Sequence, residues 1–296
     1  MTVGIPTTYQ DLLRAPVYAV LSTLMPDGQP QSTVIWCDND GRNVFVNTMR
    51  GFRKEKNMRS DPRATVLAYR LDNPLRSVEV RGRVVEMTEV GALAHLDRLS
   101  EAYTGLTPYF GKCVPVELAK RETPVLCRIV PVHVVTLDAG KPCGKQPVGN
   151  PAVLGVDRGT IPASHADLLL KPIHGVLTTL MPDGQPQSSL VWCDYDGQHV
   201  RINTSRERQK GRNMERDPRV TLLVIDPMDT SRYIELRGVA TLTETCAVEH
   251  LDMLTRKYTA YDRFYGNIYP LEKQALETRI ICQIEPTKIT LDAIHR

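Results

Sequence analysis

Long hydrophobic runs are absent from this sequence of 296 residues. Its apolar stretches, such as residues 220–225, end after about six residues, whereas about 20 are needed for a helix to cross a bilayer. The first ten residues, MTVGIPTTYQ, have no basic patch followed by an apolar stretch, so we expect no secretory signal. We therefore expect a cytoplasmic protein without membrane contact.

Cysteine usage and charge also exclude several classes of function. Seven cysteines with no C-x-x-C pair fit neither a disulfide scaffold nor a zinc site, and we expect them to be reduced and mostly buried. No HExxH motif, Walker loop or Ser-His-Asp arrangement is evident, so no metal ligand, catalytic acid, base or nucleophile is nominated. A net charge of +3 is too small to indicate nucleic acid as a partner.

One internal repeat dominates the sequence. The segment LSTLMPDGQPQSTVIWCDNDG, residues 21–41, returns as LTTLMPDGQPQSSLVWCDYDG, residues 177–197. Further along, His95 matches His250 after one deletion. The repeat predicts two copies of one domain, residues 1–140 and 161–296, joined by a Gly- and Pro-rich linker over residues 141–160. We expect the copies to pack as an intramolecular pseudo-dimer.

Within a copy, short β-rich runs alternate with turn signals, and the fold class is predicted to be mainly β. Asp and Gly at residues 27–28 and 40–41 indicate tight turns, so the first three strands should form a meander. Residues 51–60 have the composition of a helix that ends before Pro62. Residues 90–103 have helical periodicity, with Thr88 as the expected N-cap. In the first copy we expect strands at residues 18–24, 31–36, 43–47, 64–69, 77–87, 125–129 and 132–137, which favour a closed barrel.

The segment after the third strand is unusually basic in both copies. It reads NTMRGFRKEKNMRSDPR from residue 47 and NTSRERQKGRNMERDPR from residue 203. A strand that ends in Asn-Thr and leads into a basic helix offers backbone N–H groups, hydroxyl donors and cations together, which suits a phosphate monoester. The alternative is a solvated basic helix face balanced by Glu55, Glu207 and Glu215.

These motifs together resemble a known family. The order of a strand, PDGQPQS, an I-W or V-W pair, N-T-x-R with a downstream Lys and Asn, D-P-R, and a strand with R-G is similar to the flavin and deazaflavin oxidoreductases of the pyridoxamine-5′-phosphate-oxidase-like superfamily. Within it, the pattern resembles the coenzyme F420-dependent branch. The resemblance implies six-stranded split β-barrels that pair around the cofactor, and the fusion then implies a monomer with an internal pseudo-dimer interface.

The resemblance also implies which residues bind the cofactor. The Asn-Thr-x-Arg turn and the basic helix would hold its phosphate, and the Gln-Ser pair at the start of the second strand would meet its ring. Because Phe52 stands where the pattern has the arginine found as Arg208, the first phosphate site is expected to be the weaker one. The implied residues are Gln31, Ser32, Asn47, Thr48, Arg50, Arg53, Lys54 and Asn57 in the first copy, and Gln187, Ser188, Asn203, Thr204, Arg206, Arg208, Lys210 and Asn213 in the second.

The function implied is hydride transfer between F420 and a small organic substrate, with the cofactor supplying the chemistry and the protein supplying position and electrostatics. Two alternatives stay open: an FMN-dependent enzyme of the pyridoxamine phosphate oxidase type, and a non-catalytic flavin- or haem-binding protein. Against the former, the chain ends in TLDAIHR without an arginine-rich segment. Trp36, Trp192, His95 and His250 are interpreted as structural.

Overall fold

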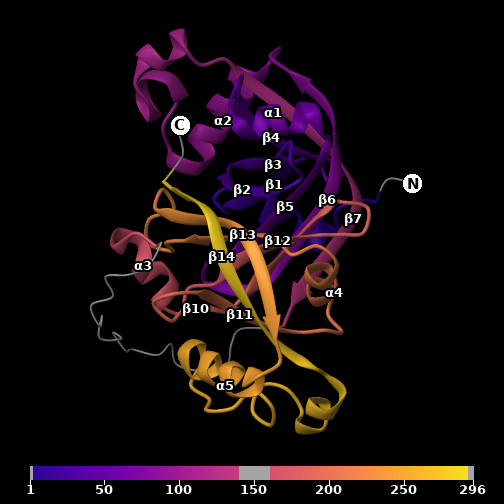
Figure 1. Cartoon of the computed structure of the whole chain (residues 1–296). Helices are drawn as coiled ribbons and strands as arrows, with labels where there is room; N and C mark the ends of the chain where they lie inside the picture. Colours follow the sequence, from indigo (N-terminus) through magenta and orange to yellow (C-terminus); the bar gives the residue numbers. More distant parts are fainter. Residues whose placement is uncertain (1–2, 140–160, 293–296) are drawn as a thin grey trace. The chain divides into compact units, whose positions relative to one another are not determined.

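The computed structural model describes residues 3–139 and 161–292. The chain divides into two compact units, Met1–Gly140 and Lys141–His295 (Figure 1). The expected linker, residues 141–160, lies outside the described residues. Each unit contains one seven-stranded sheet in which all neighbouring strands are antiparallel. The mainly β class and the two tandem split barrels are therefore confirmed.

The first unit follows the predicted order of strands and helices closely. Its sheet has the strand order β2-β1-β5-β6-β7-β4-β3. Its elements are η1 (Thr7–Leu13), β1 (Ala19–Leu24), β2 (Pro30–Ile35), β3 (Cys37–Asn39), β4 (Val44–Met49), α1 (Arg53–Ser60), β5 (Arg63–Arg70), β6 (Asn73–Thr88), α2 (Ala92–Thr104), η2 (Tyr109–Cys113), η3 (Val116–Lys120) and β7 (Pro124–Asp138).

The curl of the sheet follows from Trp36. Strands β2 and β3 lie at opposite edges of the sheet, yet Trp36 is the one residue that separates them in the chain. The chain therefore passes from one edge to the other at this residue, which requires a strongly curled sheet. Counted as one bent strand, β2 and β3 give the six strands that the resemblance implied. The predicted meander holds for this bent strand, which pairs with β1 through β2 and with β4 through β3, but residues 31–36 alone do not pair with β4, whose partners are β3 and β7.

The second unit repeats this arrangement with the order β10-β11-β14-β13-β12-β8-β9, and Trp192 separates β9 from β10 in the same way. Its elements are α3 (Ala163–Leu170), β8 (Gly175–Leu180), β9 (Pro186–Val191), β10 (Cys193–Tyr195), β11 (Val200–Ser205), α4 (Gln209–Arg216), β12 (Arg219–Ile225), β13 (Tyr233–Thr243), α5 (Ala247–Tyr258), η4 (Leu271–Leu276) and β14 (Arg279–Leu291).

Each barrel encloses its own apolar core. In the first unit, alternate residues of the strands supply it, and Val44, Val46 and Cys127 are almost fully buried. Such burial stabilises by about 1.5–3 kcal/mol for each large apolar side chain. Four of the six described cysteines are buried and all six are free, as expected for reduced and packed thiols; Cys143 lies outside the described residues.

Two local expectations in the first unit are corrected. Residues 125–129 and 132–137 belong to one long strand, β7, which bends with its neighbour at the register shift beside Gly82. A Cβ atom on Gly82 would lie 2.6 Å from the carbonyl oxygen of Val130, so glycine permits this close approach. Helix α2 is preceded by Gly91 in the left-handed conformation. Thr88 is not its N-cap and instead accepts a hydrogen bond from the N–H of Val90 at 3.1 Å.

Candidate functional site

The turn from β4 into α1 presents free backbone donors. Gly51 has a φ of +84°, a conformation that favours glycine, and α1 starts two residues later at Arg53. Phe52 gives the first turn no side-chain cap, while Glu55 accepts a hydrogen bond from the N–H of Gly51 at 3.1 Å. The first-turn N–H groups and the positive end of the helix therefore remain available to an anion.

Three buried polar side chains join α1 to the start of β2. The Asn57 amide donates to Thr23 Oγ1 at 3.0 Å and to Gln31 Oε1 at 3.3 Å. The Thr23 hydroxyl in turn donates to Gln31 Oε1 at 3.2 Å. The structure thus brings Gln31, the expected ring contact, together with Asn57, an expected phosphate-helix contact.

Lys54 and Thr48 complete this cluster at the end of the barrel. Lys54 is one turn from Asn57 on the same helix, so both side chains lie on one face. Burial lowers the pKa of Lys54 from its usual 10.5 to about 8, and the buried Cys127 on β7 opposes this shift. Cys127 pairs with Val46 on β4, two residues from Thr48 and on the same face of that strand. We call Gln31, Thr48, Lys54 and Asn57 the first site.

The first site contains polar atoms that have no partner among the described residues. Thr48 Oγ1 and Asn57 Oδ1 are buried without a hydrogen bond, in side chains that are 5% and 1% exposed. Lys54 has no acidic partner in the described parts of the chain, and its Nζ lies 6.0 Å from the centre of the Phe52 ring. Buried polar groups are normally hydrogen-bonded, so a ligand with both an anionic group and hydrogen-bond donors would complete this cluster.

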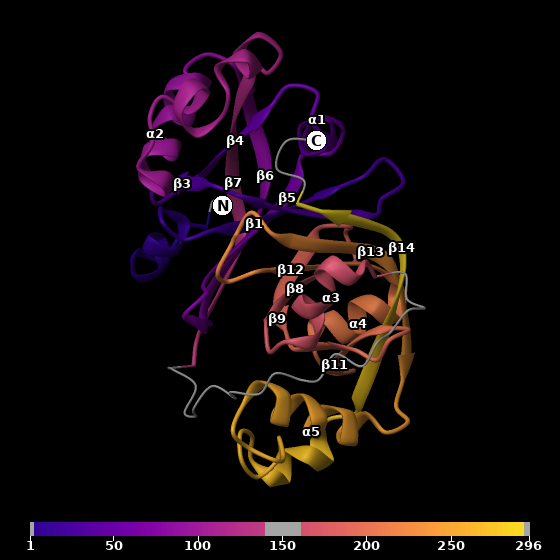
Figure 2. The ribbon, with the colours of Figure 1, turned by 90° about the vertical axis from the view of Figure 1, so that its left-hand side faces the viewer.

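The other residues predicted for this half lie apart from the first site. Successive side chains of a strand face opposite ways, so Ser32 lies across the sheet from Gln31, where it pairs with Ser22 at 2.9 Å. Asn47 likewise lies across β4 from Thr48 and donates to the carbonyl of Ala92 in α2 at 2.8 Å. Figure 2 shows α2 and α1 on different sides of β4.

The two arginines of this turn differ in their partners. Arg50 is exposed and forms an ion pair with Glu89, the residue after Thr88. Arg53 is exposed at the start of α1, and no hydrogen bond or ion pair to it occurs in the described parts of the chain. Its side chain can therefore reach a ligand without losing an internal contact.

The equivalent residues of the second half form the same cluster. Asn213 donates to Thr179 Oγ1 at 2.9 Å, and Thr179 donates to Gln187 Oε1 at 3.0 Å. Ser188 again lies on the opposite face, 3.0 Å from Thr178. We call Gln187, Thr204, Lys210 and Asn213 the second site. Thr204 Oγ1, like that of Thr48, is buried without a partner.

In the second half, two asparagine side-chain oxygens accept hydrogen bonds that their equivalents in the first half lack. Gln209 donates to Asn213 Oδ1 at 2.8 Å. Arg279 donates to Asn203 Oδ1 through Nε at 2.9 Å and Nη2 at 2.6 Å. Asn203 itself holds α5 by donating to the carbonyl of Ala247 at 2.7 Å.

The arginines beside the second site are paired with carboxylates. Arg208 lies 3.3 Å from Glu277, and Glu277 also accepts from the Tyr265 hydroxyl at 2.7 Å. Arg206 forms ion pairs with both Glu244 and Glu215. These contacts link the start of α4 to the loop that precedes β14.

An apolar cluster stands at the corresponding place in the first half. Met49, Leu96, Tyr109 and Phe110 are buried together, and Phe52 packs against them. Trp36 stacks on Tyr103 beside this cluster, with ring centres 5.3 Å apart. The tryptophan is thus part of the packing around the helix, in agreement with its structural interpretation.

The histidines are buried next to the predicted residues. His95 Nδ1 lies 3.3 Å from the Asn47 amide, and His250 Nδ1 lies 3.3 Å from that of Asn203. His250 also contacts Asp194 at 3.1 Å. Each histidine therefore helps to position an asparagine of the Asn-Thr pair.

Sequence reasoning missed several participants. Thr23 and Thr179 were visible as equivalent residues in the repeated segment, but only strand pairing places them opposite the glutamines. Arg279 and Glu277 carried no signal, because the second half differs from the first at Arg279, where β4–β7 pairing places Pro124 in the first half.

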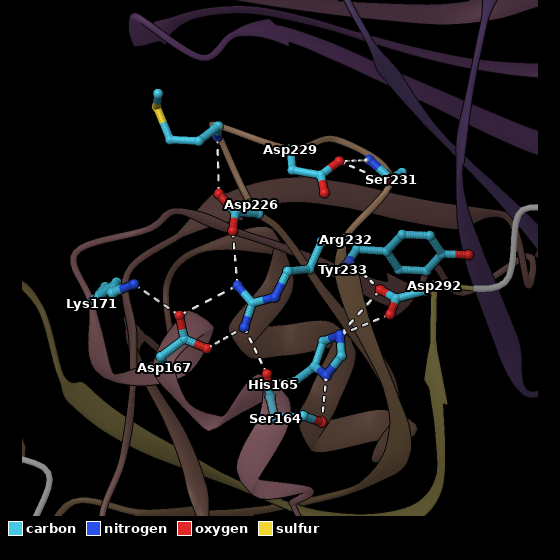
Figure 3. Close-up of polar contacts among 11 residues, drawn as sticks. Ser164, His165, Asp167, Lys171, Asp226, Asp229, Ser231, Arg232, Tyr233 and Asp292 are labelled. Carbon is cyan, nitrogen blue, oxygen red and sulfur yellow. Dashed lines mark hydrogen bonds and ion pairs between the residues drawn. The ribbon is translucent and has the colours of Figure 1, made fainter.

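A second polar cluster lies away from the second site, around the first turn of α3 (Figure 3). His165 Nδ1 lies 2.9 Å from Ser164 Oγ, and its Nε2 lies 3.1 Å from both carboxylate oxygens of Asp292. This is a Ser-His-Asp chain that the sequence did not reveal, but Ser164 and His165 are neighbours in the chain. Arg232 joins the same region to Asp167 and Asp226, so the cluster fastens α3 to the strands.

No helix is long and apolar enough to span a membrane in the described parts of the chain. Across residues 3–139 and 161–292, no group of three or more His, Cys, Asp or Glu side chains is arranged to hold a metal ion.

Comparison with known proteins matches each half separately. A family model described as pyridoxamine 5′-phosphate oxidase matches residues 5–125 and 161–291. A solved structure named F420 reductase is 31% identical, with 44% of this chain and 98% of that chain covered and a TM-score of 0.38. A conserved hypothetical protein from Mycobacterium tuberculosis is 27% identical, with 44% and 83% covered and a TM-score of 0.36. The haem storage protein from Vibrio cholerae is 14% identical, with 43% and 92% covered and a TM-score of 0.34.

Proposed function

The chain belongs to the pyridoxamine 5′-phosphate oxidase family, and from that premise we propose that it is an F420-dependent oxidoreductase. It would transfer hydride between a bound deazaflavin and a small organic substrate. The choice of F420 over FMN follows the motif resemblance of the sequence. The geometry supports binding of the features that F420 and FMN share: a flat ring, and a phosphate attached to a hydroxyl-bearing chain.

One observation carries the proposal: Lys54 is partly buried without an acidic partner among the described residues, and it lies one turn of α1 from Asn57. A lysine in a structural ion pair would have a carboxylate beside it, and a solvated lysine would keep its usual pKa. Lys54 has neither property. Thr48 Oγ1 and Asn57 Oδ1 are buried without a hydrogen-bond partner among the described residues. A phosphate with neighbouring hydroxyl groups satisfies all three.

Each residue of the first site would contact a different part of the cofactor. Lys54 and the first-turn N–H groups of α1 would hold the phosphate charge. Thr48 would donate its hydroxyl hydrogen to a phosphate oxygen, and Asn57 Oδ1 would accept from a hydroxyl of the ligand. Gln31, held by Thr23 and Asn57, would orient the ring. The bound deazaflavin or flavin supplies the hydride chemistry.

The test is a side-by-side fluorescence titration of the purified protein with F420 and FMN, followed by a screen for oxidation of reduced cofactor by small organic acceptors. Tight binding of F420 with weak binding of FMN and measurable turnover supports the proposal. Preference for FMN replaces F420 by the flavin alternative. Binding without turnover on any acceptor favours a non-catalytic binding protein, and binding of neither cofactor contradicts the function altogether.

A further inference from the structure

We propose that only the first half holds the cofactor phosphate and that the second half has filled its own site with side chains of the chain. This inference rests on the proposed function and adds to it the number and location of the working sites. It reverses the expectation, drawn from Phe52, that the first site is the weaker one.

The amide groups show the difference most directly. Asn57 Oδ1 has no partner, whereas the equivalent Asn213 Oδ1 accepts a hydrogen bond from Gln209 at 2.8 Å. Gln209 occupies the position of Arg53 in the first half. This one difference supplies a hydrogen-bond donor to the Asn213 amide oxygen and removes a cation from the second half. A ligand hydroxyl would have to displace Gln209 from Asn213 Oδ1 in the second half, but no described residue competes for Asn57 Oδ1 in the first.

The second asparagine pair shows the same contrast. Asn47 Oδ1 has no partner in the described parts of the chain, whereas Asn203 Oδ1 accepts two hydrogen bonds from Arg279. In strand pairing, Arg279 takes the place of Pro124, which has no donor to offer. The side-chain carbonyl of Asn47 beside α2 is therefore still able to accept a hydrogen bond, whereas that of Asn203 beside α5 already accepts two.

The arginines of the two halves differ in the same way as the amide groups. Arg208, which replaces Phe52, is engaged by Glu277 at 3.3 Å, so the arginine that distinguishes the second half is not free for a phosphate. Arg206 has Glu215 as an additional carboxylate, whereas the position of Glu215 is Arg59 in the first half. Residues 47–63 and 203–219 each contain six cations, but the first segment has two acidic residues and the second has three, which favours an anion in the first half.

The experiment compares matched substitutions in the full chain. FMN and F420 are titrated against the wild type, the pair Lys54→Met and Lys210→Met, and the pair Thr48→Val and Thr204→Val. The threonine pair is a second readout, because neither hydroxyl has a hydrogen-bond partner among residues 3–139 and 161–292, so its loss removes no hydrogen bond seen there. Thermal unfolding of each variant confirms that it folds.

We expect one equivalent of cofactor per chain. Lys54→Met should weaken binding about 10- to 100-fold, as loss of a charge-assisted contact does, and Thr48→Val by a smaller factor. Lys210→Met and Thr204→Val should leave affinity within about twofold. Two equivalents, or a larger effect of Lys210→Met than of Lys54→Met, would overturn the inference while the proposed function stands. Binding of neither probe by the wild type would contradict the proposed function, and the inference with it.

Discussion

Lys54 should destabilise the folded protein, because its charged ammonium group is partly buried. Lys54→Met should therefore make the protein more stable. Burial lowers the pKa of this lysine from 10.5 to about 8, and each pKa unit corresponds to about 1.4 kcal/mol. The full shift would amount to about 3 kcal/mol, and the partial exposure of the side chain reduces it. We expect the free energy of unfolding to rise by about 1–3 kcal/mol at pH 7 in the absence of cofactor.

The stability advantage of Lys54→Met shrinks as pH rises. Below pH 8 both the folded and the unfolded state carry the charge, and the folded state bears the full cost of its burial. Between pH 8 and 10.5 the unfolded state binds more protons than the folded state, so the stability of the wild type rises with pH. The advantage of Lys54→Met should therefore be complete at pH 7 and nearly gone at pH 10.5.

Urea unfolding at pH 7 and pH 10 measures both values, with Lys56→Met as the control. Lys56 lies on the same helix and is exposed, so its substitution should change stability by less than about 0.5 kcal/mol. The reasoning is refuted if Lys54→Met is no more stable than the wild type at pH 7, or if its advantage is the same at both pH values.

Three further substitutions test the fold of the second half. Gly238→Ala should destabilise by roughly 1–3 kcal/mol, because its Cβ would overlap the backbone carbonyl of Glu285; unchanged urea unfolding would contradict this packing. Burial lowers the pKa of His174 to about 4, so the wild type should lose about 1–3 kcal/mol as pH falls from 6.5 to 4, and His174→Tyr should remove most of this loss in acid unfolding. Burial raises the pKa of Asp292, but the N–H of Tyr233 and the ring of His165 outweigh it and lower the pKa overall. Asp292→Asn should therefore cost less than about 1 kcal/mol at pH 7, a difference that thermal unfolding should no longer detect well below pH 3.8.

Local sequence patterns predicted most of the elements. The basic segment gave a helix at residues 51–60, observed as Arg53–Ser60, because Pro62 fixes where it can end. The repeat gave a second copy of nearly every strand. The break at Trp36 was not predictable, because no glycine or proline interrupts residues 31–37, so the sequence was compatible with a single strand in a meander. Each part pairs with its own neighbour in the chain, and the two parts reach opposite edges because those neighbours pair with β5 and β7, which come later in the sequence.

The candidate site was predicted as a list of residues but not as a geometry. Alternation along a strand puts Thr48 and Asn47 on opposite faces, and likewise Gln31 and Ser32, so four predicted neighbours divide between two sides of the sheet. The pairing of Arg279 with Asn203 depends on a contact across 76 positions, which no local pattern reports. That the two halves pack as a pseudo-dimer and that the chain is a monomer stay predictions, which light scattering can test.

The central claim is that the first site recognises a phosphate, and the most direct test removes that phosphate from the ligand. Affinities of FMN and riboflavin, and of F420 and the deazaflavin that lacks its phosphate, are measured by fluorescence titration against the wild type and Lys54→Met. The account predicts that the wild type binds the phosphorylated ligand at least about tenfold more tightly, and that Lys54→Met loses most of this preference. Equal affinity of the wild type for both members of each pair would contradict the account.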